Sequence, residues 1–166
     1  MKNSALSLPV QAPLTPQTIG RAATLALYDE LALSPKPGLV TLIDRGSHDD
    51  MDAHTFMRSL FSLRRYFVQI AEAGAEGADF PVLERHGIAA EARMLAATGG
   101  VNTHRGAIFM LGLLCAAAGA ALREQGGALH PAGLRDALRR DWGDALASRS
   151  QRLSALPGGI AARRHG

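Results

Sequence analysis

One stretch of small and apolar residues does most to decide how this chain can fold. From Ala107 to Leu122 the sequence holds only Ala, Leu, Ile, Met, Phe, Gly and Cys, with no charged residue. Alanine and leucine are strong helix formers, and a helix that is apolar on most sides must be buried. The stretch is short for a membrane span and is interrupted by Gly112, Cys115 and Gly119. We therefore expect a helix in the core of the fold.

The composition of the whole chain agrees with a helical domain. Apolar residues make up 47% and charged residues 20%, as in ordinary globular proteins, but aromatic residues only 5%. A core of Ala, Leu, Ile, Val and Met favours helices over sheets, and 166 residues suit one domain. We predict an all-α fold, a single bundle-like domain of about five or six helices with two long functional loops.

Charge and cysteine content bear on partners and compartment. The formal net charge of +3 comes from scattered arginines, which fits a polyanionic small ligand at least as well as nucleic acid. The single Cys115 is expected to be a buried apolar residue in a reducing compartment. The first residues lack the layout of a signal peptide. We expect a cytoplasmic protein with no membrane or nucleic-acid partner and, as an open point, a homo-oligomer.

Local signals divide the chain. Residues 1–14 are expected to be a flexible leader, 15–147 a helical domain of catalytic type, and 148–166 an irregular basic tail where a longer protein would continue. Thr15 and Pro16 are typical of a helix start, and Asp52 can cap a second helix. Further helices are predicted over about 81–97, with an interruption or bend near Gly87, over the apolar stretch, and over about 131–147 with Trp142 as its large anchor.

A polar turn precedes the apolar stretch. Asn102, Thr103, His104 and Arg105 follow one another between glycines, which let the backbone approach a ligand closely. Asn102 or Thr103 can cap the next helix, and a helix N-terminus beside an arginine attracts anions. We predict that this turn faces a phosphate-bearing ligand; the alternative is only a well-capped buried helix.

A second polar segment connects the first two predicted helices. Lys36 stands between two prolines, so its ammonium is presented from a stiff segment and suits a phosphate, unless Pro-Lys-Pro is a plain surface turn. His48 is a possible base. Asp50 offers the hard oxygen ligand that Mg²⁺ prefers, or else merely helps to cap the next helix.

Two glutamates fall within otherwise apolar helical faces. Glu30 lies near the end of the first predicted helix and Glu91 in the helix over 81–97. The simplest interpretation is that both are solvated surface acids. If both helices line one cleft, the two carboxylates could bind a metal or stabilise positive charge that develops on a sugar.

These motifs together are those of a known family. The segments are Glu30 with Ser34–Val40, Gly46–Met51, Gly87–Met94, and Gly100–Phe109 with Leu111–Leu114. The chain resembles the ATP:dephospho-CoA triphosphoribosyltransferases, most strongly from about Leu31 to Gly119. Ser47 and Arg105 look more like the malonate decarboxylase branch than the citrate lyase branch, which tends to have Ala and Lys there. Members of the family continue well beyond residue 166, so the chain looks like the N-terminal part.

The resemblance implies a reaction in which ATP loses adenine. Its triphosphoribosyl group passes to the ribose 2′-hydroxyl of 3′-dephospho-CoA and gives the prosthetic-group precursor for the malonate decarboxylase acyl carrier protein. The site residues expected on this basis are His48, Asp50, Glu91 and His104 for catalysis, Lys36, Asn102, Thr103 and Arg105 for substrate binding, and Glu30 and Asp50 for Mg²⁺ as cofactor.

The expected mechanism requires the two polar segments to meet in a single ATP pocket. Two alternatives remain beside it: a non-catalytic helical module that binds nucleotide or polyphosphate, and an inactive truncated fragment whose exposed apolar face drives self-association.

Overall fold

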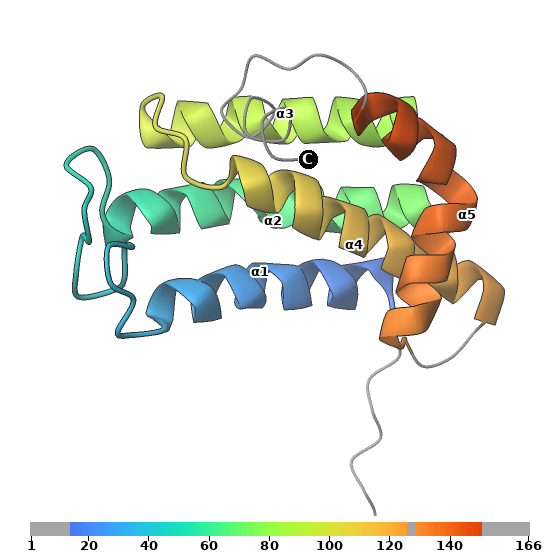
Figure 1. Cartoon of the computed structure of the whole chain (residues 1–166), viewed down its shortest axis with the longest axis horizontal. Helices are drawn as coiled ribbons and strands as arrows, with labels where there is room; N and C mark the ends of the chain where they lie inside the picture. Colours follow the sequence, from blue (N-terminus) through green and yellow to red (C-terminus); the bar gives the residue numbers. More distant parts are fainter. Residues whose placement is uncertain (1–13, 126–128, 151–166) are drawn as a thin grey trace, which may run out of the picture.

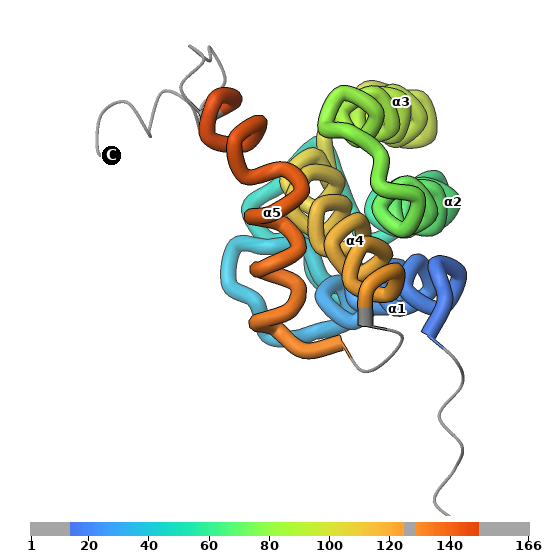
Figure 2. The backbone as a smooth tube through the Cα atoms, turned by 90° about the vertical axis from the view of Figure 1, so that its right-hand side faces the viewer, coloured from blue at the N-terminus to red at the C-terminus, as the bar shows by residue number. Residues whose placement is uncertain are grey.

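The computed structural model describes residues 14–125 and 129–150. In this part of the chain there are five helices and no strand: α1 (Pro16–Ala32), α2 (Ala53–Ala75), α3 (Phe80–Thr98), α4 (Arg105–Gln125) and α5 (Pro131–Ser150). Helices α1 to α4 run in alternating directions, from right to left and back in Figure 1, and α4 lies between α2 and α5 (Figure 2). The predicted all-α fold is confirmed.

The helix boundaries follow local capping signals. Thr15 and Thr18 form a reciprocal capping box at the start of α1, with Pro16 in the first position. Asp52 caps α2 by accepting a hydrogen bond from the backbone N–H of Thr55 at 2.8 Å. Both predicted starts are confirmed because a capping side chain satisfies N–H groups that the helix itself cannot.

Two expectations about boundaries are corrected. Helix α3 runs without interruption through Gly87, since neighbouring residues supply enough helix propensity and packing to carry one glycine. Helix α5 continues to Ser150, so residues 148–150 are helical rather than irregular. The remainder of the expected tail, 151–166, and positions 1–13 of the expected leader lie outside the described residues.

Small residues bring α2 and α4 into close contact. A Cβ on Gly119 would lie 2.9 Å from the backbone nitrogen of Ala75 and closer still to the Ala71 carbonyl oxygen. A Cβ on Gly74 would meet the backbone of Ala116 in the same way. The two helix backbones therefore touch, which explains why glycine and alanine dominate the apolar stretch.

Helix α4 is the core helix that its sequence predicts. It is long and apolar enough to span a membrane by length and composition, but half of that window is buried inside the bundle. Cys115 is buried, as expected. The buried Tyr66 on α2 donates a hydrogen bond to the Ile108 carbonyl at 2.8 Å. Trp142, the predicted anchor of α5, is buried and donates from Nε1 to the Ala78 carbonyl at 2.9 Å.

The alternating direction of the helices decides where the loops lie. The 33–52 loop follows α1, and the 99–104 turn follows α3. Both connections lie at the same end of the bundle, on the left in Figure 1. The two polar segments singled out in the sequence are therefore neighbours in space at one end of the fold.

Candidate functional site

The 33–52 loop is held in shape by hydrogen bonds of its own. The hydroxyl of Thr41 accepts from the backbone N–H of Asp44 at 3.0 Å, and the Thr41 N–H donates to the Asp44 carbonyl at 2.7 Å. Gly38 and Gly46 both have positive φ, and a Cβ on Gly46 would lie 2.5 Å from the Gly38 carbonyl carbon. These glycines let the loop fold back on itself, which side chains at those positions would prevent.

The structure brings Lys36 and Glu30 together. The Lys36 ammonium donates to a carboxylate oxygen of Glu30 at 2.7 Å and to the Glu30 carbonyl at 2.6 Å. The Lys36 side chain is only 10% exposed, whereas that of Glu30 is 53% exposed. A lysine on the last carbonyls of α1 is favourably placed relative to the helix dipole. Before any phosphate arrives, the ammonium therefore already has an acidic partner.

His48 and Asp50 remain accessible. His48 Nδ1 lies 3.9 Å from a carboxylate oxygen of Asp50, at the outer limit of an ion pair; the Asp50 side chain is largely exposed and that of His48 is partly exposed. Throughout residues 14–125 and 129–150, no three His, Cys, Asp or Glu side chains cluster to hold a metal ion. Glu30 and Asp50 thus do not form a preformed three-ligand site in the described residues.

Two of the predicted substrate-binding residues have internal partners. Asn102 accepts a hydrogen bond from the backbone N–H of Arg105 at 3.2 Å, so the predicted cap of α4 is confirmed. The Thr103 hydroxyl donates to the hydroxyl of Ser59 on α2 at 2.7 Å. These contacts fix the 99–104 turn against the bundle, and any role in substrate binding would come in addition to them.

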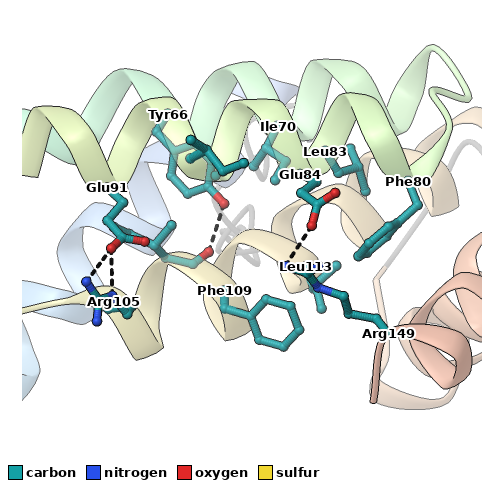
Figure 3. Close-up of a pocket in the computed structure, with 13 residues that line it drawn as sticks. Tyr66, Ile70, Phe80, Leu83, Glu84, Glu91, Arg105, Phe109, Leu113 and Arg149 are labelled. Atoms are coloured by element: carbon teal, nitrogen blue, oxygen red, sulfur yellow. Dashed lines mark hydrogen bonds and ion pairs between the residues drawn. The ribbon is translucent and has the colours of Figure 1, made fainter. Parts of the chain in front are cut away.

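Arg105 and Glu91 form an ion pair between α4 and α3. Arg105 Nε donates to a Glu91 carboxylate oxygen at 2.7 Å, and Nη2 contacts the same oxygen. The pair borders a cavity of about 280 Å³ between α3, α4 and the end of α5. Figure 3 shows this pair at one end, the Glu84–Arg149 pair toward the other, and Phe109 between them. The cavity is lined mainly by apolar side chains.

His104 is the most deeply placed of the predicted catalytic residues. Its side chain is buried, with Nδ1 2.6 Å from the Ser59 hydroxyl oxygen and its ring at an edge-on contact with Phe56. Burial lowers the pKa of His104 to about 4, opposed in part by the negative charge of Glu30. The imidazole is therefore neutral at pH 7.

Two cavities border the polar segments and have different walls. The cavity described above includes Glu91 and Arg105, while another is lined by residues 41–45 and 52–54 of the loop and the start of α2. Neither of these two is lined by both polar segments. The expected single ATP pocket stays a prediction: the segments share an end of the bundle, but these two cavities are separate.

Sequence reasoning missed Ser59. The signal was present, because Ser59 lies three residues after Phe56 and four before Leu63, on the apolar stripe of α2. A lone hydroxyl on a buried face needs a partner, and here the partners are Thr103 and His104. Without the structure, nothing in the sequence says which partner it finds.

A comparison with protein families matches residues 16–154 to the family model described as CitG: ATP:dephospho-CoA triphosphoribosyl transferase. A probable 2-(5''-triphosphoribosyl)-3'-dephosphocoenzyme-A synthase of Albidiferax ferrireducens is 46% identical over 109 residues, covering 62% of this chain and 36% of that protein. The synthase of Pectobacterium atrosepticum is also 46% identical, over 57% of this chain and 33% of its own length.

The Protein CitXG of Haemophilus influenzae is 44% identical, over 64% of this chain and 24% of that protein. The chain thus spans about a third or less of the length of these curated relatives. No solved structure matches the chain. The family match extends over most of the sequence and includes both polar segments, so the chain belongs to the CitG family of ATP:dephospho-CoA triphosphoribosyl transferases.

Proposed function

We propose that this chain acts in the transfer of the triphosphoribosyl group of ATP to the ribose 2′-hydroxyl of 3′-dephospho-CoA, with release of adenine. Family membership supports the reaction class. The observation that carries the proposal for these residues is that the 33–52 loop and the 99–104 turn lie at the same end of the bundle, with Lys36 in the loop and Arg105 directly after the turn. One extended ligand bound at that end would meet side chains from both polar segments.

The ion pairs at this end suggest how a triphosphate binds. Lys36 and Arg105 each already contact one carboxylate, from Glu30 and Glu91. A polyanionic ligand competes with these carboxylates for the same N–H donors, aided by the first N–H groups of α4. A displaced carboxylate then lies next to the ligand, where it can stabilise positive charge that develops on the ribose.

The chemical step follows from the substrates. The bond between the ribose C1′ and adenine breaks, and adenine leaves with the electron pair and gains a proton. The 2′-hydroxyl oxygen of dephospho-CoA forms the new bond to C1′ and loses its proton. His48 and Asp50 are the candidates to take that proton, since both side chains are accessible and they are only weakly associated with each other.

The described residues fit a magnesium ion that is held mainly by the substrate phosphates and by water. With no three-ligand cluster among the described side chains, the protein would supply only few of the ligands. Asp50 suits this mode better than Glu30, because Glu30 is paired with Lys36. When bound, Mg²⁺ would neutralise phosphate charge.

We assign the chain to the malonate decarboxylase branch as a finer proposal. Arg105 supports it, because its guanidinium uses two nitrogens against Glu91, a geometry that the lysine typical of the other branch does not reproduce. Ser47, whose backbone N–H donates to the Gly38 carbonyl, is the second branch feature. Disruption of the gene should abolish growth of its host on malonate and spare growth on citrate; the reverse result would assign the other branch.

The main experiment measures adenine released from ATP in the presence of magnesium and dephospho-CoA. Arg105→Ala should weaken ATP binding, whereas Asp50→Asn should spare binding and impair turnover or its magnesium dependence. Arg139→Ala is the matched control, since Arg139 is exposed on α5. Heat protection by ATP without adenine release would favour the non-catalytic binding module. If both site variants behave like the control, these residues do not belong to the site.

A further inference from the structure

Three polar side chains form a continuous contact between α2 and the start of α4. The Thr103 hydroxyl donates to the Ser59 hydroxyl oxygen at 2.7 Å, and that oxygen lies 2.6 Å from His104 Nδ1. Ser59 is fully buried and His104 nearly so. In such an environment, hydrogen bonds are stronger than they are in water. None of the roles argued above accounts for Ser59.

The number of protons in this contact limits the states that the imidazole can adopt. A serine hydroxyl has one proton to donate and lone pairs with which to accept. Because Ser59 accepts from Thr103, its own proton is available to Nδ1 of His104. The same atom positions also allow a protonated Nδ1 to donate to the Ser59 oxygen, which has a second lone pair. In the first arrangement, on which our proposal rests, Nδ1 is unprotonated. A neutral imidazole has its single proton on the other nitrogen, and the ring therefore carries N–H at Nε2.

The protonated nitrogen is the one open to a ligand. Within the described chain, Nε2 has no hydrogen-bond partner, yet no described side-chain polar atom is both buried and unpaired. Nε2 therefore reaches the surface although the ring is largely covered. The burial that lowers the pKa of His104 keeps the ring neutral at pH 7, so it offers one donor there and no free acceptor.

We propose that Ser59 is a positioning residue that holds His104 with Nδ1 as acceptor and with the Nε2 N–H directed to an oxygen of the triphosphoribosyl donor. This inference rests on the proposed function and refines it. His104 binds substrate as a hydrogen-bond donor and does not remove the proton of the 2′-hydroxyl. That step is left to His48 or Asp50.

Nitrogen NMR of the ¹⁵N-histidine-labelled chain at pH 7 tests the tautomer directly. His104 is assigned by its absence in His104→Gln. We expect a protonated Nε2 and an unprotonated, hydrogen-bonded Nδ1. Ser59→Ala should shift the Nδ1 resonance, whereas Ser62→Ala should leave it unchanged. Ser62 is the matched control, because it lies on the same helix and donates to the Ser59 carbonyl without contacting His104.

A protonated Nδ1 or a doubly protonated ring in the parent protein would overturn the proposal. So would a folded Ser59→Ala variant with an unchanged Nδ1 resonance. The parent spectrum decides the tautomer even if Ser59→Ala does not fold. The NMR measurement also requires no catalytic turnover, so its result on the tautomer remains valid if adenine release is never observed.

A second measurement uses the geometry of amide side chains. The amide nitrogen of glutamine can replace Nε2, while that of asparagine reaches only the position of Nδ1. ATP–magnesium affinity should be largely kept in His104→Gln and should fall roughly tenfold or more in His104→Asn, because a hydrogen bond to a charged oxygen is lost. Equal loss in both variants would contradict a donor role. No ATP binding by the parent would instead refute the proposed function, and the NMR result would still stand.

Discussion

Replacing Gly119 by alanine tests whether contact between the backbones of α2 and α4 sets the geometry of the bundle. In an isolated helix this change is favourable by about 1 kcal/mol. Here the added methyl would lie 2.9 Å from Ala75 N and nearer still to Ala71 O, whereas real Cβ contacts stay above 3.0 Å. Because both opposing atoms are backbone, no side chain can rotate away, and the helices must separate.

The expected cost follows from that separation. The Ala71 carbonyl must move away by roughly 1 Å, and this loosens a layer in which the neighbouring alanines are completely buried. Overpacking of this kind costs about 3 kcal/mol, the upper end of its usual range, since rigid helices cannot adapt locally. After the gain in helix propensity, Gly119→Ala should lower the free energy of unfolding by about 2 kcal/mol.

Urea unfolding followed by circular dichroism measures this difference. Gly143→Ala on α5 is the matched control, because nothing lies within 4 Å of its added methyl, and it should gain up to about 1 kcal/mol. Since Ser59 lies on α2 and His104 precedes α4, the Nδ1 resonance of His104 should also shift in Gly119→Ala. Equal stabilisation of both variants would refute the close contact between α2 and α4.

Three further predictions concern charge and hydrogen bonds. Folding lowers the pKa of His104 from 6.5 to about 4, so the unfolded chain binds more protons than the folded chain between these pH values. The contribution of neutral His104 to the free energy of unfolding is therefore fully present above about pH 6.5 and falls by about 3 kcal/mol toward pH 4. Urea titrations at several pH values should find a smaller pH dependence in His104→Gln. Tyr66→Phe removes the bond to the Ile108 carbonyl and should cost about 1 kcal/mol in the same assay, and an unchanged urea midpoint would argue against that bond. Glu91→Gln leaves Arg105 without its acidic partner, so ATP affinity by calorimetry should rise while adenine release falls; unchanged affinity would mean that the pair does not compete with phosphate.

Features that depend on short sequence separations were predictable. The starts of α1 and α2 follow from Thr15 and Asp52, whose side chains bond to backbone groups only three residues away. The Asn102 cap is of the same kind. The burial of Cys115 follows from the apolar stretch around it. Each of these features depends on residues that are neighbours along the chain, and such neighbours are known from the sequence alone.

Pairings across the bundle were not predictable. Lys36 and Glu30 were expected to act separately on phosphate and metal, yet they contact each other. Arg105 finds Glu91 only because α3 returns to the start of α4. Of the interruption or bend expected near Gly87, the interruption is absent, since packing along α3 outweighs the propensity of one glycine. In each case the outcome depends on how helices approach, which no local pattern contains.

The position of both loops at one end of the bundle, by contrast, follows from the number and order of the helices. In a bundle whose helices alternate in direction, the connection after α1 and the connection after α3 must share an end. The order of the helices does not give the charge at that end of the bundle.

Lys36 and Arg105 each have a carboxylate partner, so the two positive charges are balanced before a ligand binds. A triphosphate carries several negative charges and gains little net attraction from balanced pairs, and the dipole of α4 is a modest contribution. It must either displace Glu30 and Glu91 or arrive with its own cation. Either route would place a carboxylate beside the ribose or a metal beside the phosphates, which is the arrangement that the proposed loss of adenine from ATP would use.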